Sequence, residues 1–287
     1  MILHCCKYQG AGNDFVILDN RKGDVLLTDA QVNRLCDRRF GIGADGLMLL
    51  GAPACEGMDF SMRYFNADGP EGTMCGNGGR CLVAFAAHLG LKKFEFTAID
   101  GYHRAEILEY GETKCIVRLK MRDLKPENGR NPVERLSDGC FLNTGSPHFV
   151  GFVDDVSAYD VDTNGKRLRY DNRFEGGTNV NFVEAVKQDR EDAPRGLKVR
   201  TYERGVEAET WACGTGVTAS SIAAYAYGIQ TYDTDKNGRI YFNVQTLGDR
   251  LSVDFLTPSD GCFEDIHLTG PAAKVFETEI DIDSLFL

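Results

Sequence analysis

A four-residue pattern, Cys-Gly-x-Gly, occurs twice in this chain of 287 residues, and an almost wholly apolar stretch follows each copy. The first copy begins at Cys75 and the second at Cys213, which is 138 residues later. The same offset carries Tyr64 onto Tyr202. A repeat with a period of about half the chain length indicates two structurally similar halves.

The stretches after the two patterns, residues 77–89 and 215–227, predict helices of an unusual kind. Apart from Arg80, neither stretch carries a charged side chain in its first turns, and a helix that is apolar nearly all round is a buried helix. Each stretch ends at a glycine, Gly90 or Gly228, which is the usual residue at a helix C-terminus. We therefore expect one buried helix at the centre of each half.

Short strands are predicted for most of the remaining sequence. They are rich in Val, Ile, Phe and Tyr, and Gly, Asp and Asn turns bound most of them. The clearest runs are residues 59–66, 114–121, 148–153, 197–203 and 240–246. One amphipathic helix is expected from the N-cap Thr28 to Arg39. The polar stretch 124–138 is the expected boundary between the halves.

Composition excludes several classes of partner and site. The net charge of −11 argues against a surface for nucleic acid or for anionic membranes. The sequence has no apolar run long enough to span a bilayer and no secretory leader pattern, so the cytoplasm is the expected location. Ten cysteines without a C-x-x-C pair, and with scattered histidines, favour neither disulfides nor zinc.

A cysteine placed before Gly-x-Gly at a helix start is in a reactive position. The first turn of a helix leaves backbone N–H groups without intrahelical partners, and glycines let a ligand approach them closely. The positive field there favours a thiolate and would also accept the carboxylate of a substrate. A single such pattern is more often structural, whereas the duplicated pair, Cys75 and Cys213, favours catalysis.

Two thiols on opposite sides of a substrate suit the inversion of a stereocentre. One cysteine removes a proton as a thiolate, and the other returns a proton to the opposite face as a thiol. The two helix N-termini would stabilise a carbanion-like intermediate through its carboxylate, by on the order of 3 kcal/mol for each preorganised donor.

Six stretches of the chain, in this order, resemble the motif series of the diaminopimelate epimerase family. They are Gly12-Asn13-Asp14-Phe15-Val16, Gly41-Ile42-Gly43-Ala44-Asp45-Gly46, Asn66-Ala67-Asp68-Gly69, Met74-Cys75-Gly76-Asn77-Gly78, Tyr202-Glu203-Arg204-Gly205 and Ala212-Cys213-Gly214-Thr215-Gly216. Together they span nearly the whole chain, and their combination is far more specific than any one motif.

The resemblance implies an isomerase that interconverts LL- and meso-2,6-diaminopimelate in lysine and peptidoglycan biosynthesis, with no cofactor and no metal. Cys75 and Cys213 would be the catalytic pair. The backbone N–H groups that hold the reacting carboxylate would belong to Gly76, Asn77, Gly214 and Thr215. The side chains that hold the distant amino and carboxylate groups would be Asn13, Asn66, Asn179, Glu203 and Arg204. Apart from this small-molecule substrate, the resemblance suggests a homodimer as the only partner.

The resemblance also implies an architecture of class α/β (α+β), with two pseudo-symmetric halves. Each half would be a curved, mostly antiparallel sheet around a central buried helix, and the active site would lie in the cleft between them. The final strand, residues 275–280, would return to the first half. The expected halves are therefore residues 1–125 plus 274–287, which carry Cys75, and residues 126–273, which carry Cys213.

One motif departs from the family pattern. The family often has Gly-Asn-Pro-His where this chain has Gly145-Ser146-Pro147-His148. The hydroxyl of Ser146 is shorter than an asparagine amide, so its contact with substrate is less direct than the family residue would make. We place Ser146 and His148 in the shell around the substrate, and we favour that role for His148 over that of a catalytic base.

Three other interpretations fit parts of the sequence. The string Gly41-x-Gly43-x-x-Gly46 matches a dinucleotide fingerprint, but it follows a helix and precedes the apolar run 47–50, the reverse of the required order. A proline or hydroxyproline racemase also uses two cysteines, but it would not need Glu203 and Arg204 together. The third is a binding protein or a thiol-redox protein, and a redox role would need the two cysteines close enough to bridge.

Overall fold

The computed structural model describes residues 1–186 and 195–286. The chain divides into two compact units, Met1–Leu119 with Gly270–Leu287 and Lys120–Thr269. Within the described residues, no helix is both long enough and apolar enough to cross a membrane.

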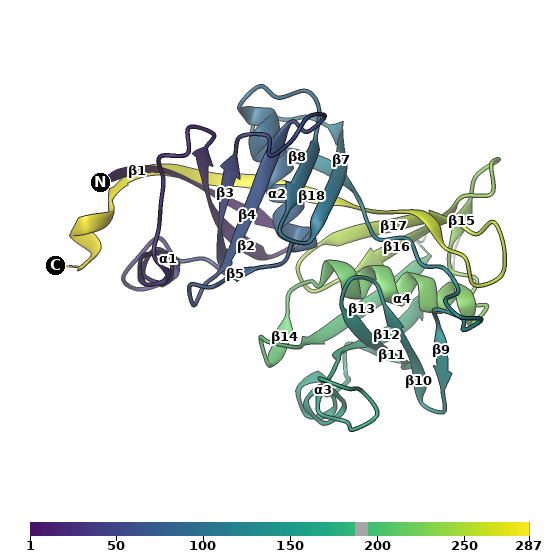
Figure 1. Ribbon diagram of the computed structural model, residues 1–287. Coiled ribbons are helices and arrows are strands. Elements are labelled where there is room, and N and C mark those ends of the chain that lie inside the picture. Colours follow the sequence, from purple (N-terminus) through teal and green to yellow (C-terminus); the bar gives the residue numbers. More distant parts are fainter. Residues whose placement is uncertain (187–194, 287) are drawn as a thin grey trace. The chain divides into compact units, whose positions relative to one another are not determined.

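The first unit holds α1, α2 and the early strands (Figure 1). Its elements are β1 (Ile2–Gly10), β2 (Asn13–Asn20), α1 (Asp29–Cys36), β3 (Gly46–Gly51), β4 (Phe60–Asn66), β5 (Glu71–Gly72), α2 (Gly76–His88), β6 (Glu95–Ala98), β7 (Gly101–Glu109) and β8 (Lys114–Lys120). The long strand β18 (Glu264–Asp281) begins in the second unit and continues into the first, where the 3-10 helix η1 (Ile282–Phe286) follows it.

The strands of the first unit pair in the order β18–β1–β2–β3–β4–β6–β7–β8. The strand β8 also pairs with β18, so the pairings form a closed ring. The pairs β2–β3 and β4–β6 are parallel, and most of the others are antiparallel. Residues 276–280 of β18 pair with β1, and the register shifts at residue 275.

Helix α2 fills the interior of the first sheet and packs against β1, β2, β3 and β7. Every residue from Gly76 to Ala87 is buried, which explains the lack of a polar face in its sequence. The backbone of β1 approaches the helix closely at Gly10, where an added Cβ would lie 3.1 Å from both the Asn77 carbonyl oxygen and the Cys81 sulfur. A glycine at this position therefore allows the close contact between helix and strand.

The second unit repeats this plan around α4 (Figure 1). Its elements are β9 (Glu134–Leu136), β10 (Gly139–Asn143), β11 (Pro147–Phe152), α3 (Val161–Arg169), β12 (Asn179–Val186), β13 (Gly196–Glu203), β14 (Ala208–Thr210), α4 (Gly214–Ala226), β15 (Asp233–Thr234), β16 (Ile240–Gln245) and β17 (Arg250–Leu256). The strands pair in the order β9–β10–β11–β12–β13–β16–β17–β18.

The two units share their sequence of elements and their parallel pairs. The parallel pair β11–β12 corresponds to β2–β3, and the parallel pair β13–β16 corresponds to β4–β6. Helix α4 packs against β10–β13, β16 and β17, as α2 packs within the first sheet. The prediction of two similar α/β halves, each with a buried central helix, is confirmed.

The five clearest runs and the two buried helices lie where the sequence predicted them, within one residue at each end, whereas the final strand, expected at residues 275–280, is part of the longer β18. The amphipathic helix is shorter than predicted and ends at Cys36 instead of Arg39. Thr28 is its N-cap and forms a capping box with Gln31. The helix stops because Asp37 adopts an extended backbone and its carboxylate accepts the N–H groups of Arg39 and Phe40, which favours a turn over another helical turn.

Candidate active site

Both cysteines of the duplicated pattern are helix N-cap residues. Cys75 precedes α2 with φ −91° and ψ 130°, and Cys213 precedes α4 with φ −107° and ψ 111°. At neither of these two fully described helix starts does the cysteine side chain accept a capping hydrogen bond. The first-turn N–H groups of each helix therefore present a positive end beside a sulfur atom, as the sequence predicted.

In the first unit, the side chain of Asn77 links the start of α2 to β2. Its Nδ2 donates to Asn13 Oδ1, and its Oδ1 accepts from Arg80 Nη2 at 2.9 Å. Arg80 is fully buried and also donates to the Gly76 carbonyl at 3.4 Å. The predicted residues Asn13 and Asn77 are thus in direct contact.

A group of ion pairs holds Asn13 from the other side. Asn13 Nδ2 donates to Asp45 at 3.0 Å, and Arg38 binds both Asp45 and Asp14. Lys7 Nζ lies 2.8 Å from Asp14. Burial alone would raise the pKa of Asp14, but hydrogen bonds from Arg38 and Lys7 outweigh it and lower the pKa to about 2. The string Gly41-x-Gly43-x-x-Gly46 contributes Asp45 to this group of ion pairs.

Asn66 lies at the end of β4, where its side chain is exposed. Its backbone N–H donates to the Pro70 carbonyl at 3.0 Å and its Nδ2 makes a long contact of 3.5 Å with the same oxygen. A tight turn therefore fixes the backbone of Asn66, while its amide group faces solvent within this unit.

In the second unit, a chain of hydroxyl groups leads to Cys213. Thr215 Oγ1 lies 3.5 Å from the Cys213 sulfur and 3.2 Å from Ser146 Oγ. Ser146 Oγ lies 2.9 Å from His148 Nε2. The structure thus brings together four of the predicted residues, although Ser146 and His148 are separated from Thr215 by a long stretch of sequence.

His148 is completely buried in β11. Its Nδ1 lies 3.1 Å from Asn181 Nδ2, which also donates to the Phe149 carbonyl. Burial, reinforced by the positive charge of Arg204, lowers the pKa of His148 to about 3. The imidazole is therefore neutral at physiological pH and is poorly suited to act as a base toward solvent.

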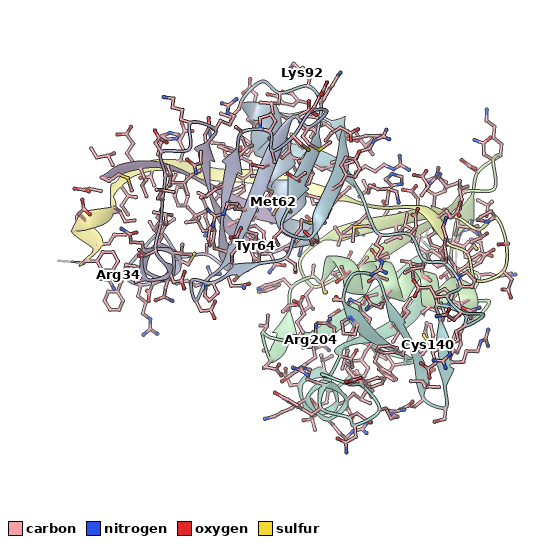
Figure 2. The ribbon with its side chains drawn as sticks, viewed as in Figure 1. Arg34, Met62, Tyr64, Lys92, Cys140 and Arg204 are labelled. Atoms are coloured by element: carbon pink, nitrogen blue, oxygen red, sulfur yellow. The ribbon has the colours of Figure 1, made fainter. Side chains whose placement is uncertain are left out.

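The residues expected to bind the distant end of the substrate gather where β12 and β13 meet the following turn. The Arg204 backbone N–H donates to Asn179 Oδ1 at 2.9 Å, and Asn179 Nδ2 donates to the Pro147 carbonyl at 2.9 Å. Glu203 accepts from Thr210 Oγ1 at 2.6 Å. Arg204 directly follows the last residue of β13, and its side chain is exposed within this unit (Figure 2). Its Nη1 makes a long contact of 3.5 Å with the Gly176 carbonyl oxygen.

A family model described as diaminopimelate epimerase matches residues 5–121 and 140–260. A diaminopimelate epimerase of Flavobacterium psychrophilum is 46% identical over 278 residues, which cover 96% of this chain and 98% of the relative. The diaminopimelate epimerase of Chlorobaculum tepidum is 42% identical, over 95% of this chain and 99% of the relative. This chain belongs to the diaminopimelate epimerase family.

Solved structures with much lower identity share the fold. A phenazine biosynthesis protein of the PhzF family from Bacillus anthracis matches with a TM-score of 0.68 at 15% identity, over 98% of this chain and 99% of that one. A hydroxyproline epimerase from Agrobacterium vitis matches with a TM-score of 0.65 at 13% identity, over 97% and 92%. The diaminopimelate epimerase family therefore shares its architecture with proteins of different named activities.

The remaining cysteines of this family member are free thiols, and most are buried. Burial raises the pKa of Cys5, Cys36 and Cys140 to about 12, and it also raises the pKa of Cys81 within α2. A thiol with a raised pKa is a poor nucleophile at neutral pH. These groups serve as packing, as predicted for Cys81.

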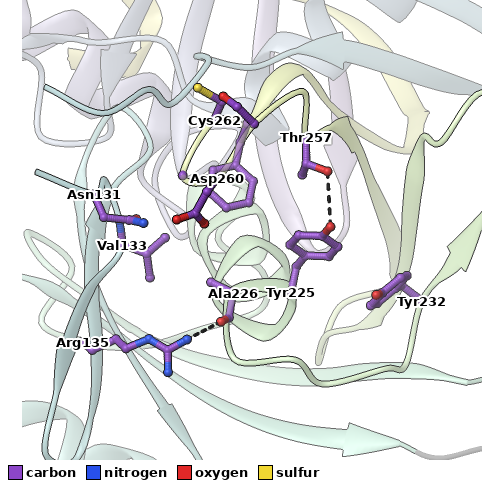
Figure 3. A pocket seen from close by; sticks show the side chains of 12 residues that line it. Asn131, Val133, Arg135, Tyr225, Ala226, Tyr232, Thr257, Asp260 and Cys262 are labelled. Atoms are coloured by element: carbon purple, nitrogen blue, oxygen red, sulfur yellow. Dashed lines mark hydrogen bonds between the residues drawn. The ribbon is translucent and has the colours of Figure 1, made fainter. Parts of the chain in front are cut away.

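Two other features of this family member lie away from the predicted site. A cavity of about 500 Å³ in the second unit is lined by Tyr225 and Ala226 at the C-terminal end of α4, opposite to the end that carries Cys213 (Figure 3). In the first unit, ligand atoms of His4, Cys6 and Glu277 lie within 4.8 Å of one another. The Glu277 carboxylate there is ion-paired with Lys274 at 2.6 Å.

Sequence reasoning missed the residues behind the motifs. Asp45 and Asn181 each hold a predicted residue in place, yet neither was assigned a role. Asp45 lies in a motif that was already recognised, and Asn181 points to the same face of β12 as Asn179 because it is two residues away. Both signals were available, but only the fold shows what these side chains contact.

Proposed function

We propose that this protein is a cofactor-independent epimerase that interconverts LL- and meso-2,6-diaminopimelate, and that Cys75 and Cys213 are its two acid/base groups. The observation that carries the proposal is the pair of N-cap thiols, each at the start of a buried helix, in a member of this family. The reaction needs a base on one face of the carbon and an acid on the other, and these roles exchange when the reaction runs in reverse. Two thiols can take either role.

The two helix starts are the proposed carboxylate site. The backbone N–H groups of Gly76 and Asn77 in α2, and of Gly214 and Thr215 in α4, would donate to the carboxylate beside the reacting carbon. Negative charge builds up on that carboxylate as the proton leaves, so these donors would bind the transition state more strongly than the substrate. The resting enzyme has already oriented them within its helices.

The distant amino and carboxylate groups are proposed to bind five side chains, Asn13, Asn66, Asn179, Glu203 and Arg204. The exposure of the Arg204 guanidinium supports this role, since it can form a bidentate pair with a carboxylate. Asn13 carries a second Nδ2 hydrogen beyond the one that it gives to Asp45. Asn179 accepts the Arg204 backbone N–H, so it also orients that residue.

The organisation around this site is also part of the proposal. We propose that the two functional halves are residues 1–125 plus 274–287 and residues 126–273. We further propose a cytoplasmic homodimer, which rests on the resemblance to the family. Sedimentation equilibrium of the purified protein would test the dimer, and a single monomeric species at micromolar concentration would contradict it.

Turnover measurements on matched substrates test the function. The reduced protein should convert LL-diaminopimelate to the meso isomer without added metal or cofactor, and it should leave L-proline unchanged. Glu203→Gln and Arg204→Lys should each weaken turnover of diaminopimelate, because Glu203 and Arg204 are proposed to bind the distant end of this substrate, which proline lacks. Turnover of L-proline alone would move the protein to the racemases, and turnover of neither substrate by folded, reduced protein would contradict the proposal.

A further inference from the structure

We infer that Glu207 is a positioning residue for the distant end of the substrate: it ties the turn that carries Arg204 to the end of α3, and so holds Arg204 where it can bind a carboxylate. The inference rests on the proposed function, because it takes Arg204 as a ligand of the distant carboxylate. Glu207 lies two residues beyond the stretch Tyr202-Glu203-Arg204-Gly205, so the motif itself does not include it.

The backbone of Glu207 has a conformation that favours glycine. Its φ is 59°, in the left-handed region that residues with a side chain adopt rarely. Its N–H donates to the Glu203 carbonyl at 2.9 Å, and its own carbonyl accepts from Tyr202 Oη at 2.7 Å. A glutamate is strained at such a position relative to glycine, so its presence there points to contacts of its side chain that offset the strain.

The Glu207 carboxylate makes contacts in two directions. Its Oε1 accepts from the Gly205 N–H at 3.0 Å, which closes the turn, and from Arg169 Nε at 3.0 Å. Its Oε2 accepts from Tyr170 Oη at 2.9 Å. Arg169 is the last residue of α3, and Tyr170 is its C-cap. Burial alone would raise the pKa of Glu207, but these hydrogen bonds and the Arg169 charge outweigh it and lower the pKa, so the carboxylate is ionised at neutral pH.

Helix α3 gives this contact a firm base. Its buried residues Val161 and Leu168 belong to the same core cluster as Tyr202. The helix also approaches the end of β13 closely, since a Cβ added at Gly165 would lie 2.5 Å from the Tyr202 Cβ. Glu207 therefore connects the turn after β13 to an element that is packed into the core of this unit.

The ion pair with Arg169 also keeps Glu207 from competing for Arg204. The two residues lie three positions apart in one turn, so a carboxylate without its own cation would attract the Arg204 guanidinium away from a substrate. Arg169 Nη2 lies 3.0 Å from Glu207 Oε1 and neutralises it. Asn179 holds the Arg204 backbone N–H at 2.9 Å, while the Arg204 side chain is exposed within this unit. An arginine with its backbone already fixed loses less conformational freedom when it binds an anion.

A double-mutant cycle tests whether Glu207 acts through Arg204. Glu207→Gln keeps the size of the side chain but removes the charge that pairs with Arg169. It should raise the KM for LL-diaminopimelate about tenfold, the factor that one hydrogen bond to a charged group typically supplies. Its kcat should change by less than about twofold, because the reacting end of the substrate is not involved. In an Arg204→Met background, the same change should lower kcat/KM by less than about threefold, since the residue that it positions is already gone.

Two variants serve as controls. Glu207→Gly relieves the backbone strain but also lacks the carboxylate, so it should raise KM as Glu207→Gln does. Asp160→Ala removes the N-cap of α3 at the end opposite to Arg169, and it should leave KM unchanged. A wild-type KM in both Glu207 variants would overturn the inference. Equal losses of kcat/KM in the Arg204 and Arg204→Met backgrounds would overturn it as well, because Glu207 would then act independently of Arg204.

Hydrogen exchange separates this inference from the proposed function. Exchange of the backbone N–H groups in the turn 203–207 is followed by mass spectrometry without substrate, and Glu207→Gln should speed it by about tenfold. Equal exchange in the wild type and Glu207→Gln would overturn the inference even if the enzyme is active. A wild type that does not turn over diaminopimelate would remove the proposed function, whereas faster exchange in the variant would still support the contact that holds the turn.

Discussion

The first turns of α2 and α4 carry the same Cys-Gly-x-Gly sequence, but the side chains behind them differ in chemistry. Asn77 and Thr215 occupy the same position after the two cysteines. Asn77 lies between a buried guanidinium, that of Arg80, and Asn13, which is held in turn by Asp45. Thr215 lies at the end of a series of neutral groups that leads from His148 to Cys213.

One repeated motif therefore leads into two different networks of side chains. The backbone N–H groups at each helix start follow from the fold alone, so both halves present these donors in the same arrangement. The side chain of the x residue differs between the halves: Asn77 contacts Asn13 at the start of β2, whereas Thr215 contacts Ser146 beside β11. In the first half, the Asn77 amide binds the Arg80 guanidinium, and in the second half, the Thr215 hydroxyl lies 3.5 Å from the Cys213 sulfur.

Removal of either thiol should have the largest effect, and it tests whether both halves take part in the reaction. We expect Cys75→Ala and Cys213→Ala each to lower kcat by at least about a thousandfold, and the double variant to be no worse than either single one, because the two groups act as a unit. Steady-state assays with LL- and with meso-diaminopimelate would measure this. Near-normal turnover in one single variant would mean that the halves do not share the chemistry.

The two halves should also differ in their response to acid. His148 has a pKa of about 3 in the folded protein and about 6.5 when unfolded, so only the unfolded chain binds its proton between these values. The free energy of unfolding should therefore fall by up to about 1.4 kcal/mol for each pH unit below 6.5. Asp14 has a lowered pKa of about 2, so its contribution is lost only as the pH falls below about 4.

Urea unfolding of the wild type and of His148→Gln between pH 7.5 and 4.5 would separate these effects. The glutamine cannot titrate, so the variant should lose most of the slope between pH 6.5 and 4.5. Asp14→Asn should keep that slope. Equal slopes in the wild type and His148→Gln would show that this histidine is not held neutral.

Alanine substitutions at the second glycine of each pattern, Gly78 and Gly216, form a matched pair with smaller expected effects. A Cβ at Gly216 would lie 2.3 Å from Asn181 Oδ1, whereas a Cβ at Gly78 would lie 3.1 Å from the flexible Met48 sulfur. Gly216→Ala should therefore destabilise by about 2 kcal/mol through overpacking, and Gly78→Ala by less than about 1 kcal/mol because the helix gains propensity. Chemical denaturation would measure the two losses of stability, and a larger loss for Gly78→Ala than for Gly216→Ala would contradict this prediction.

The smallest expected effects come from the peripheral helices α1 and α3. Thr28 and Asp160 are their N-caps and accept the N–H groups of Gln31 and Thr163, respectively. Alanine at either position should cost about 1 kcal/mol, and Thr28→Ala should cost slightly more because a capping box is lost. Thermal unfolding would measure both. An unchanged kcat in both variants is expected, since neither residue belongs to the site.

The sequence predicted the features that are encoded locally. The two buried helices follow from apolar runs bounded by cysteine and glycine, and the N-cap at Thr28 follows from its spacing to Gln31. The helix end at Cys36 was missed, because the competing turn depends on how the Asp37 carboxylate is oriented. Local sequence patterns do not specify how a side chain is oriented.

The networks behind the cysteines could not be predicted for a different reason. Ser146 and Thr215 are 69 residues apart, and Asn13 and Asn77 are 64 residues apart, so no local pattern joins them. In the sequence, Ser146 stands out only as a departure from a family motif. Its contact with both His148 and Thr215 became visible when β11 and the start of α4 were placed together.

Isotope exchange in heavy water tests the central claim, that two separate thiols act on opposite faces of one carbon, most directly. LL-diaminopimelate is incubated with reduced enzyme in D₂O, and the α-carbon is followed by proton NMR at early times. The account predicts that the meso product carries solvent deuterium at the inverted carbon, while the remaining LL substrate keeps its hydrogen. Transfer of the original hydrogen to the product would show that a single base serves both faces, and it would contradict the account.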